Sequence, residues 1–120
     1  MHKLNIVYYE GQANRDIRSR LARSRGEDPF RPYSIRSEAT LPIVPRPGDH
    51  VYFPITEKES KFYSTEERDG TPHMSGVVQW VEMYNGCEDM YVIVTDEGHE
   101  GRGIYSGDLE EEIRDFLANT

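Results

Sequence analysis

The chain has 120 residues, the length of one ordinary domain, so we expect a single domain spanning residues 1–120. Hydrophobic side chains make up only 36% of the chain and charged side chains 30%, which predicts a small core. The formal net charge of −8 argues against a protein whose whole surface coats DNA or an anionic membrane.

Cysteine content and hydropathy narrow the cellular setting. The single cysteine, Cys87, excludes an internal disulfide framework, so a reducing compartment is the default. No apolar run approaches the roughly 20 residues that span a bilayer, and Leu4–Tyr9 is too short for the core of a signal peptide. We therefore expect a cytoplasmic protein that makes no membrane contact.

Charge is divided unevenly along the chain. Residues 1–48 carry nine basic and five acidic side chains, a net charge of +4, whereas residues 49–120 carry five and seventeen, a net charge of −12. No linker long enough to separate two cores is visible, so the pattern indicates one bipolar domain. Opposite charges at its two ends make a monomer or a weak head-to-tail homo-oligomer the expected state.

The N-terminal segment predicts a strand followed by a helix. Leu4–Tyr9 is β-branched and aromatic and is followed by Glu-Gly, which predicts a strand. Asn14 is the expected cap of a helix that ends near Arg25, with Ile17 and Leu21 as its only apolar stripe. This stripe is narrow, so Asn14–Arg25 is expected to be either a lightly docked helix or a mobile arm. With the predicted loop Glu27–Pro32 it forms an Arg-rich insertion over residues 14–32.

The middle of the chain predicts two strands and a long loop. Every second residue of Tyr33–Leu41 is expected to lie on one buried face, because these positions alternate with polar or charged ones. The expected buried face consists of Tyr33, Ile35, Ser37, Ala39 and Leu41. The turn Pro47–Gly48–Asp49 precedes a second strand, His50–Pro54. Residues 56–73 are strongly charged and are predicted to form a polar loop.

The clearest predicted element is a hairpin. Gly76–Tyr84 and Met90–Thr95 are rich in β-forming residues and flank an Asn-Gly turn. Apolar residues occupy both expected faces, namely Val78, Trp80 and Tyr84 on one and Val77, Val81 and Met83 on the other. This pattern predicts a central hairpin covered on both sides. The cover is expected to be another sheet, a closed barrel wall or a C-terminal helix over residues 108–118 that Asp108 caps, and we favour the helix on one side.

Together these elements predict an α+β, mainly β fold. We expect a small, bent antiparallel sheet or SH3-like barrel of about five strands, with a C-terminal helix and a short Arg-rich N-terminal helix or arm; an open α+β sheet is the alternative. The run LPIVPRPGD at Leu41–Asp49, followed by a strand and a GVVQWV hairpin, resembles short bacterial and phage β proteins of unassigned function. It is also similar to SH3-like barrels, in which a Gly-Asp turn opens one strand. The resemblance covers about residues 33–95 and implies a fold, because SH3-like barrels bind many unrelated things.

The residues that carry metal and nucleophile chemistry are few. The internal candidates are His50, His73, His99 and Cys87. No pair has a short metal-ligand spacing, and the carboxylates that follow Cys87 disfavour its thiolate. We therefore predict no catalytic residue, no metal ligand and no cofactor. A small enzyme with a His/Cys site assembled by the fold is the third functional hypothesis.

Arginines and aromatic residues carry the remaining functional signal. Five arginines lie within residues 15–25, where they either contact phosphates or balance the acidic part of the chain. Eight Tyr, four Phe and one Trp exceed what a small core needs, and Tyr and Trp are enriched at the centres of interfaces. The leading hypothesis is therefore a non-enzymatic module that binds another protein, as an inhibitor or accessory subunit.

The expected binding residues combine both groups: Arg18, Arg20 and Arg23 with the exposed members of the set Phe62, Tyr63 and Tyr84. The alternative hypothesis is a nucleic-acid-binding module that uses the Arg-rich segment over residues 15–36.

Overall fold

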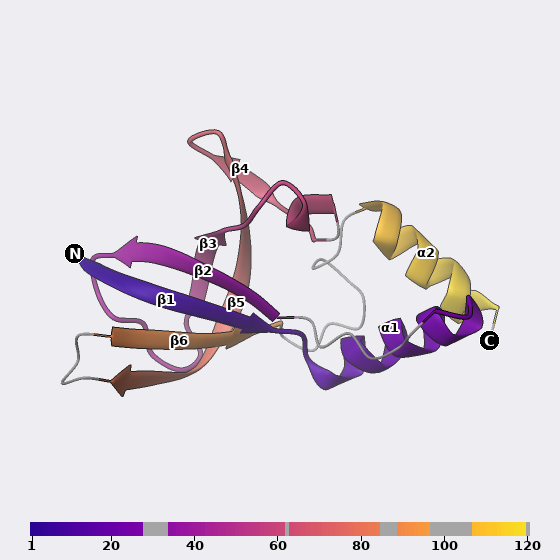
Figure 1. Cartoon of the computed structure of the whole chain (residues 1–120), viewed down its shortest axis with the longest axis horizontal. Coiled ribbons are helices and arrows are strands. Elements are labelled where there is room, and N and C mark those ends of the chain that lie inside the picture. Colours follow the sequence, from indigo (N-terminus) through magenta and orange to yellow (C-terminus); the bar gives the residue numbers. More distant parts are fainter. Residues whose placement is uncertain (28–33, 62, 85–88, 97–106, 120) are drawn as a thin grey trace.

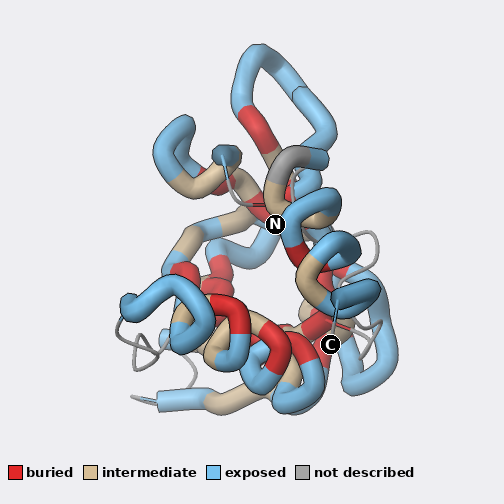
Figure 2. The backbone as a smooth tube through the Cα atoms, turned by 90° about the vertical axis from the view of Figure 1, so that its right-hand side faces the viewer, coloured by how far each residue is buried: buried red, intermediate tan, exposed pale blue. Residues whose placement is uncertain are grey.

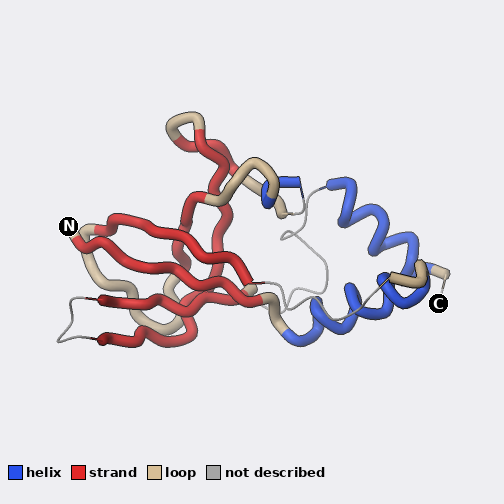
Figure 3. The backbone as a smooth tube through the Cα atoms, viewed as in Figure 1, coloured by secondary structure: helices blue, strands red, loops and turns tan. Residues whose placement is uncertain are grey.

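The computed structural model describes residues 1–27, 34–61, 63–84, 89–96 and 107–119 (Figure 1). Its elements follow one another in the order β1 (His2–Tyr9), α1 (Gln12–Ser24), β2 (Ser34–Leu41), β3 (His50–Pro54), a short 3-10 helix (Glu59–Lys61), β4 (Glu66–Arg68), β5 (Thr71–Tyr84), β6 (Asp89–Thr95) and α2 (Gly107–Ala118). Strands occupy one end of the molecule and the two longer helices the other (Figure 3).

The strands form a nearly closed, barrel-like sheet. Their order is β2-β1-β6-β5-β3, and β4 pairs with β5. All pairings are antiparallel except that of β1 with β6, which is parallel. At the seam between the edge strands β2 and β3, the Ser37 hydroxyl donates a hydrogen bond of 2.6 Å to the Pro54 carbonyl. The predicted α+β, mainly β class with a C-terminal helix is confirmed, but the sheet was expected to be antiparallel and the β1–β6 pair is parallel.

The core fills the inside of this curved sheet. Along β1 the residues Leu4, Ile6 and Tyr8 point inward and are fully buried. The Tyr8 ring packs edge-on against Tyr63, with ring centroids 5.9 Å apart. Buried residues recur on every side of the ring of backbone seen from the helical end (Figure 2).

Strand β2 bears out the predicted alternation. Ile35 is buried, its inward neighbours Ser37, Ala39 and Leu41 are half-buried, and the intervening residues are exposed. Tyr33, expected on the same face, lies outside the described residues.

The turn before β3 ties that strand to β5. Gly48 has a φ of 94°, a left-handed conformation that favours glycine, and the Arg46 N–H donates to the Asp49 carboxylate at 2.8 Å. The Gly48 N–H donates to the Val78 carbonyl, and the Val78 N–H donates to the Asp49 carbonyl. The predicted Pro47–Gly48–Asp49 turn therefore sets where pairing with β5 ends.

The prediction of a polar loop over residues 56–73 was wrong. It contains the 3-10 helix, β4 and the first residues of β5. Arg68 pairs with Thr71 across a two-residue turn in which Asp69 and Gly70 have φ values of 52° and 76°. Asp-Gly with two positive φ angles is the preferred chemistry of the tightest β-hairpins, so this charged segment is a hairpin arm.

A bulge in β5 overturns the predicted faces of the central hairpin. Val78 pairs with Val94 but Trp80 pairs with Ile93, so Gln79 is an extra residue in the ladder. Val78 consequently points into the core, whereas Trp80 is turned outward and is 50% exposed. The inner side of the hairpin packs on the core, and on its outer side Ile93 is also buried beside the half-exposed Trp80.

Both helices differ in detail from the sequence prediction. Helix α1 begins at Gln12 with Gly11 as its N-cap, and the predicted cap Asn14 is completely buried inside it. Helix α2 packs on α1 beyond the end of the sheet (Figure 1) and does not cover the hairpin. Ile113 of α2 nevertheless reaches the core cluster.

Contacts between α1 and α2 use arginine side chains. Arg20 lies over the Phe116 ring at 5.6 Å from its centroid, and Arg25 forms an ion pair of 3.2 Å with Glu112. Neither helix, nor any other helix of the described residues, has the length and apolarity needed to cross a membrane.

The seam makes a first prediction. Replacing Ser37 by Ala removes the side-chain bond that joins β2 to β3 and leaves the Pro54 carbonyl without it, so the free energy of unfolding should fall by about 1 kcal/mol. Urea unfolding followed by circular dichroism measures the loss. Ser34→Ala, an exposed serine of the same strand, is the matched control and should change little. Equal effects of the two variants would show that the hydroxyl does not hold the seam.

Candidate binding surface

The residues expected to bind a partner do not form one surface. Arg18, Arg20 and Arg23 lie on α1, which follows the C-terminal end of β1. Tyr84 pairs with Asp89 at the first residue of β6, and because β6 runs parallel to β1 this is the opposite end of the sheet. The structure therefore separates the arginines from Tyr84.

The individual environments of these residues also differ. Arg18 pairs with Glu10 and Arg20 stacks on Phe116, whereas Arg23 is exposed. Tyr63 is only 1% exposed and belongs to the core, so it is not one of the exposed aromatic residues that were expected to bind. Phe62 lies outside the described residues. Of the expected aromatic residues, Tyr84 is the one that the structure places at the surface.

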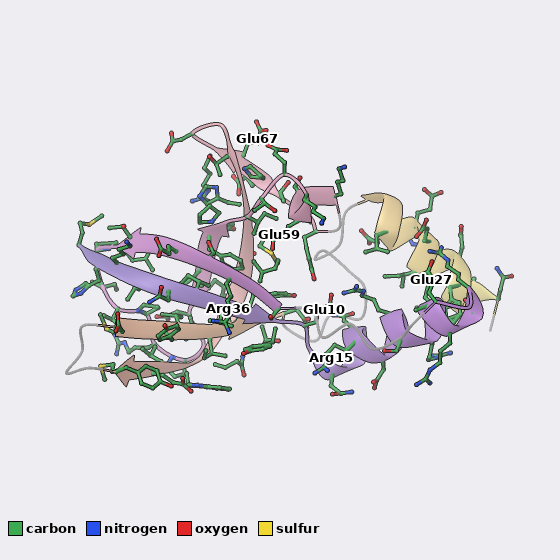
Figure 4. The ribbon with its side chains drawn as sticks, viewed as in Figure 1. Glu10, Arg15, Glu27, Arg36, Glu59 and Glu67 are labelled. Atoms are coloured by element: carbon green, nitrogen blue, oxygen red, sulfur yellow. The ribbon has the colours of Figure 1, made fainter. Side chains whose placement is uncertain are left out.

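A buried polar cluster joins α1 to the sheet, and we call it the polar joint. Its members are Tyr8, Glu10, Gly11, Arg18, Tyr63 and Asp96. Glu10 and Asp96 directly follow β1 and β6, and the ends of these two strands lie together because the pairing is parallel. Figure 4 shows Glu10 where β1 leads into α1. The parallel pairing thus places two buried carboxylates at one end of the sheet.

Each carboxylate of the polar joint has hydrogen-bond donors around it. Glu10 accepts a bond of 2.9 Å from the Tyr63 hydroxyl and is paired with Arg18. Asp96 accepts a bond of 2.6 Å from the Gly11 N–H and a longer one from the Tyr8 hydroxyl. Because Gly11 is the N-cap of α1, Asp96, which follows β6, supplies the side-chain cap that α1 lacks in its own sequence.

Electrostatics agree with a structural role for the polar joint. Burial raises the pKa of Tyr63 far above its ordinary value, and the neighbouring Glu10 carboxylate raises it further. Tyr63 therefore stays protonated and acts as a hydrogen-bond donor. We interpret the polar joint as the contact that holds α1 against the end of the sheet, because both of its carboxylates are bonded within the molecule.

The residues considered for metal or nucleophile chemistry are not brought together among the described residues. His73 pairs with Pro54 and His50 with Val77, so the two histidines lie at opposite ends of the β3–β5 ladder. Cys87 and His99 lie outside the described residues. In the part of the chain that is described, no three His, Cys, Asp or Glu side chains are grouped so as to hold a metal ion.

The outer face of the sheet carries a second apolar cluster. Cross-strand partners share a face, so Trp80, Ile93 and Val7 form one row across β5, β6 and β1. Val7 and Ile93 are buried although they point away from the core cluster. Tyr9 and Trp80, half-exposed, lie on the same face. We call this set of Val7, Tyr9, Trp80 and Ile93, together with Tyr84 and Tyr91, the outer aromatic face.

At one end of this face a carboxylate holds two aromatic rings, an arrangement that we call the aromatic clamp. The Trp80 indole N–H donates to Glu82 Oε1 at 2.8 Å, and the Tyr84 hydroxyl donates to Glu82 Oε2 at 2.7 Å. Tyr84 also packs edge-on against Tyr91, with centroids 5.5 Å apart. The bonds from Tyr84 and Trp80 lower the pKa of Glu82, and the bond to Glu82 raises the pKa of Tyr84.

Sequence reasoning found Tyr84 but missed Trp80 and Glu82. The alternation of residues in β5 counted Val78 and Trp80 on one face, and the bulge at Gln79 separates them. The i, i+2, i+4 spacing of Trp80, Glu82 and Tyr84 was the available signal, because such residues lie on one side of a strand.

Comparisons with known proteins give no functional lead. No protein-family model matches the chain, and neither the curated proteins nor the solved structures provide a match.

The cap of α1 makes a second prediction. A Cβ at Gly11 would lie 2.6 Å from Asp96 Oδ1, so Gly11→Ala must displace the carboxylate that caps the helix. The backbone of Gly11, with φ −65° and ψ 155°, accepts alanine, so the cost is steric and we expect about 1–2 kcal/mol of lost stability in urea. Gly107→Ala, where nothing lies within 4 Å, is the matched control. Equal unfolding midpoints for the two variants would contradict the capping role of Asp96.

The Tyr63–Glu10 bond makes a third prediction. Because the folded-state pKa of Tyr63 is raised above the ordinary 10.0, its stabilisation is complete below about pH 10 and is lost as the pH rises further, when only the unfolded chain releases the proton. Tyr63→Phe should remove this share of the alkaline loss, up to about 1.4 kcal/mol per pH unit, while costing about 1 kcal/mol at neutral pH.

Urea unfolding on either side of the ordinary tyrosine pKa of 10.0 measures the slope. The half-exposed Tyr52→Phe, which also removes one tyrosine hydroxyl, is the control. An unchanged slope in Tyr63→Phe would show that the buried hydroxyl is not titrating differently in the two states.

Proposed function

We propose that this protein is a non-enzymatic module that binds another protein through the outer aromatic face, in the cytoplasm, as an inhibitor or accessory subunit. The observation that carries the proposal is the aromatic clamp, in which Trp80 and Tyr84 are each 50% exposed yet held in place by Glu82. Large exposed aromatic side chains next to a buried apolar centre mark interaction sites.

The rigidity of the clamp supports binding. Ordering flexible side chains costs free energy on association, and rings that are already hydrogen-bonded avoid part of that cost. Trp80 and Tyr84 have few rotatable bonds and are anchored through both oxygens of one carboxylate. The face is therefore preorganised for a partner.

Its location supports the same conclusion. Both helices lie beyond the end of the sheet, so neither covers the outer face (Figures 1 and 3). The row from Trp80 through Ile93 and Val7 ends at Arg36 on β2, which gives the apolar centre a polar rim. An apolar centre with a polar rim is the usual composition of a protein–protein interface.

The Arg-rich segment offers weaker support for nucleic-acid binding. Three of its arginines are engaged within the molecule, Arg18 with Glu10, Arg20 with Phe116 and Arg25 with Glu112. Among the described residues this leaves Arg15 and Arg23 as the exposed arginines of α1 without such contacts. The SH3-like comparison also remains a prediction of the sequence, and the proposal does not depend on it.

The test is affinity capture from the native host followed by titration of the purified partner. Trp80→Ala should weaken binding by at least about 30-fold, the effect of losing a central aromatic anchor. Tyr52→Ala removes a similarly exposed tyrosine from β3 and should leave the affinity unchanged.

Two kinds of result would contradict the proposal. One is a failure of this test, either because no partner is captured or because Trp80→Ala leaves the partner affinity intact. The other is tight binding of labelled DNA or RNA that falls steeply with salt and is lost in the Arg15→Ala, Arg23→Ala double variant, which would favour the nucleic-acid alternative.

A further inference from the structure

Glu82 retains acceptor capacity that its two aromatic neighbours do not use. An ionised carboxylate offers about four lone-pair positions, and Trp80 and Tyr84 occupy one on each oxygen. The side chain is only half-buried, so solvent or a ligand reaches it. In the described part of the chain no basic side chain forms an ion pair with Glu82.

Two other rings of the described residues, the half-exposed Tyr52 and the partly buried Phe116, each have an arginine over them. Arg68 lies over the Tyr52 ring at 4.2 Å from its centroid, and Arg20 lies over Phe116. Each is a cation–π contact supplied from within the chain. Among the described residues, Trp80 and Tyr84 have no such cation, although tryptophan is the strongest cation–π partner.

We infer that the aromatic clamp receives a basic side chain, arginine or lysine, from the protein partner. This inference rests on the proposed function and names the chemistry of its central contact. The cation pairs with Glu82 and packs against the rings of Trp80 and Tyr84, so that charge, hydrogen-bonding capacity and aromatic surface are all used at one position.

Charge on a larger scale favours the same occupant. Residues 49–120, which contain the clamp, carry a net charge of −12, so they attract a basic segment over a distance. Glu38 closes the row of Glu82, Tyr91 and Asn5 on the far side but is already paired with Lys3 at 3.5 Å. Glu82 is therefore the carboxylate of that row that is available to a partner.

The sole tryptophan of the chain makes the test direct, because fluorescence excited at the red edge of tryptophan absorption, where tyrosine does not absorb, reports Trp80 alone. The probes are blocked Gly-Arg-Gly and Gly-Lys-Gly peptides and the Gly-citrulline-Gly peptide, in which a neutral urea replaces the guanidinium at nearly equal size. Both basic peptides should change Trp80 emission with saturation, and citrulline should bind at least about tenfold more weakly. The basic-peptide affinity should also fall as salt is raised.

Two matched variants locate the contact. Glu82→Gln keeps an acceptor for the rings but removes the charge, and it should reduce the affinity for the arginine peptide about tenfold or more. Glu38→Gln changes the other carboxylate of the same cross-strand row and should leave it unaffected. Near-ultraviolet circular dichroism verifies that Trp80 keeps its environment in Glu82→Gln, and the citrulline comparison needs no variant at all.

The possible outcomes separate this inference from the proposed function. Equal affinities for the arginine and citrulline peptides, or no basic-peptide binding, would overturn the inference, and a partner affinity that still depends on Trp80 would leave the proposed function intact. Binding of the arginine peptide together with a partner affinity that ignores Trp80 would contradict the proposed function. A single-stranded oligonucleotide that binds Trp80 more tightly than the basic peptides would replace the cation with a stacked base.

Discussion

One extra residue in β5 determines which side chains of that strand form the outer aromatic face. The bulge at Gln79 places Val78 in the core and Trp80 on the surface, although the two are only two positions apart. A bulge also increases the local bend and twist of a strand, which suits a sheet that curls until β2 approaches β3. The same irregularity therefore serves both the curvature of the barrel-like sheet and the exposure of the aromatic clamp.

The parallel pairing of β1 with β6 is the second constraint on the fold. It brings Glu10 and Asp96, 86 residues apart in the chain, to one end of the sheet, where they anchor α1 through Arg18 and Gly11. This explains how a helix with a narrow apolar stripe stays docked. Buried polar contacts replace the hydrophobic area that Ile17 and Leu21 alone do not provide.

Local patterns predicted the local structure well. β-Branched and aromatic composition identified β1, alternation identified β2, the Pro-Gly-Asp turn located the start of β3, and the Asn-Gly signal located the β5–β6 hairpin. The Asp-Gly turn at Asp69 and Gly70 was also present in the sequence, but the charged residues around it were interpreted as a loop. One of its two strands, β4, is fully exposed. A strand that is exposed on both faces carries no hydrophobic period, so turn chemistry was the signal to follow.

Long-range structure was predicted poorly, for a physical reason. Asn is a preferred residue type at a helix N-cap, which is why Asn14 was expected there. The cap comes instead from Asp96, through a contact that no local pattern encodes. Likewise, tyrosine is a residue type that is common in interfaces, but Tyr63 packs on Tyr8 in the core. The single-residue register shift at Gln79 exchanged the faces of every following residue in β5, which is why the clamp was missed.

The division of charge gains a structural meaning from these contacts. Among the nine basic side chains of residues 1–48, Arg18 pairs with Glu10 in the polar joint and Arg25 pairs with Glu112 on α2. Arginines that hold the fold together are poorly placed to bind phosphates, because each such contact would cost an internal one. In the proposed complex, the acidic remainder of the chain, which contains the aromatic clamp, supplies the field that attracts the partner. A basic partner approaching that field meets Glu82 between two ordered rings, so long-range attraction and short-range recognition favour the same ligand chemistry.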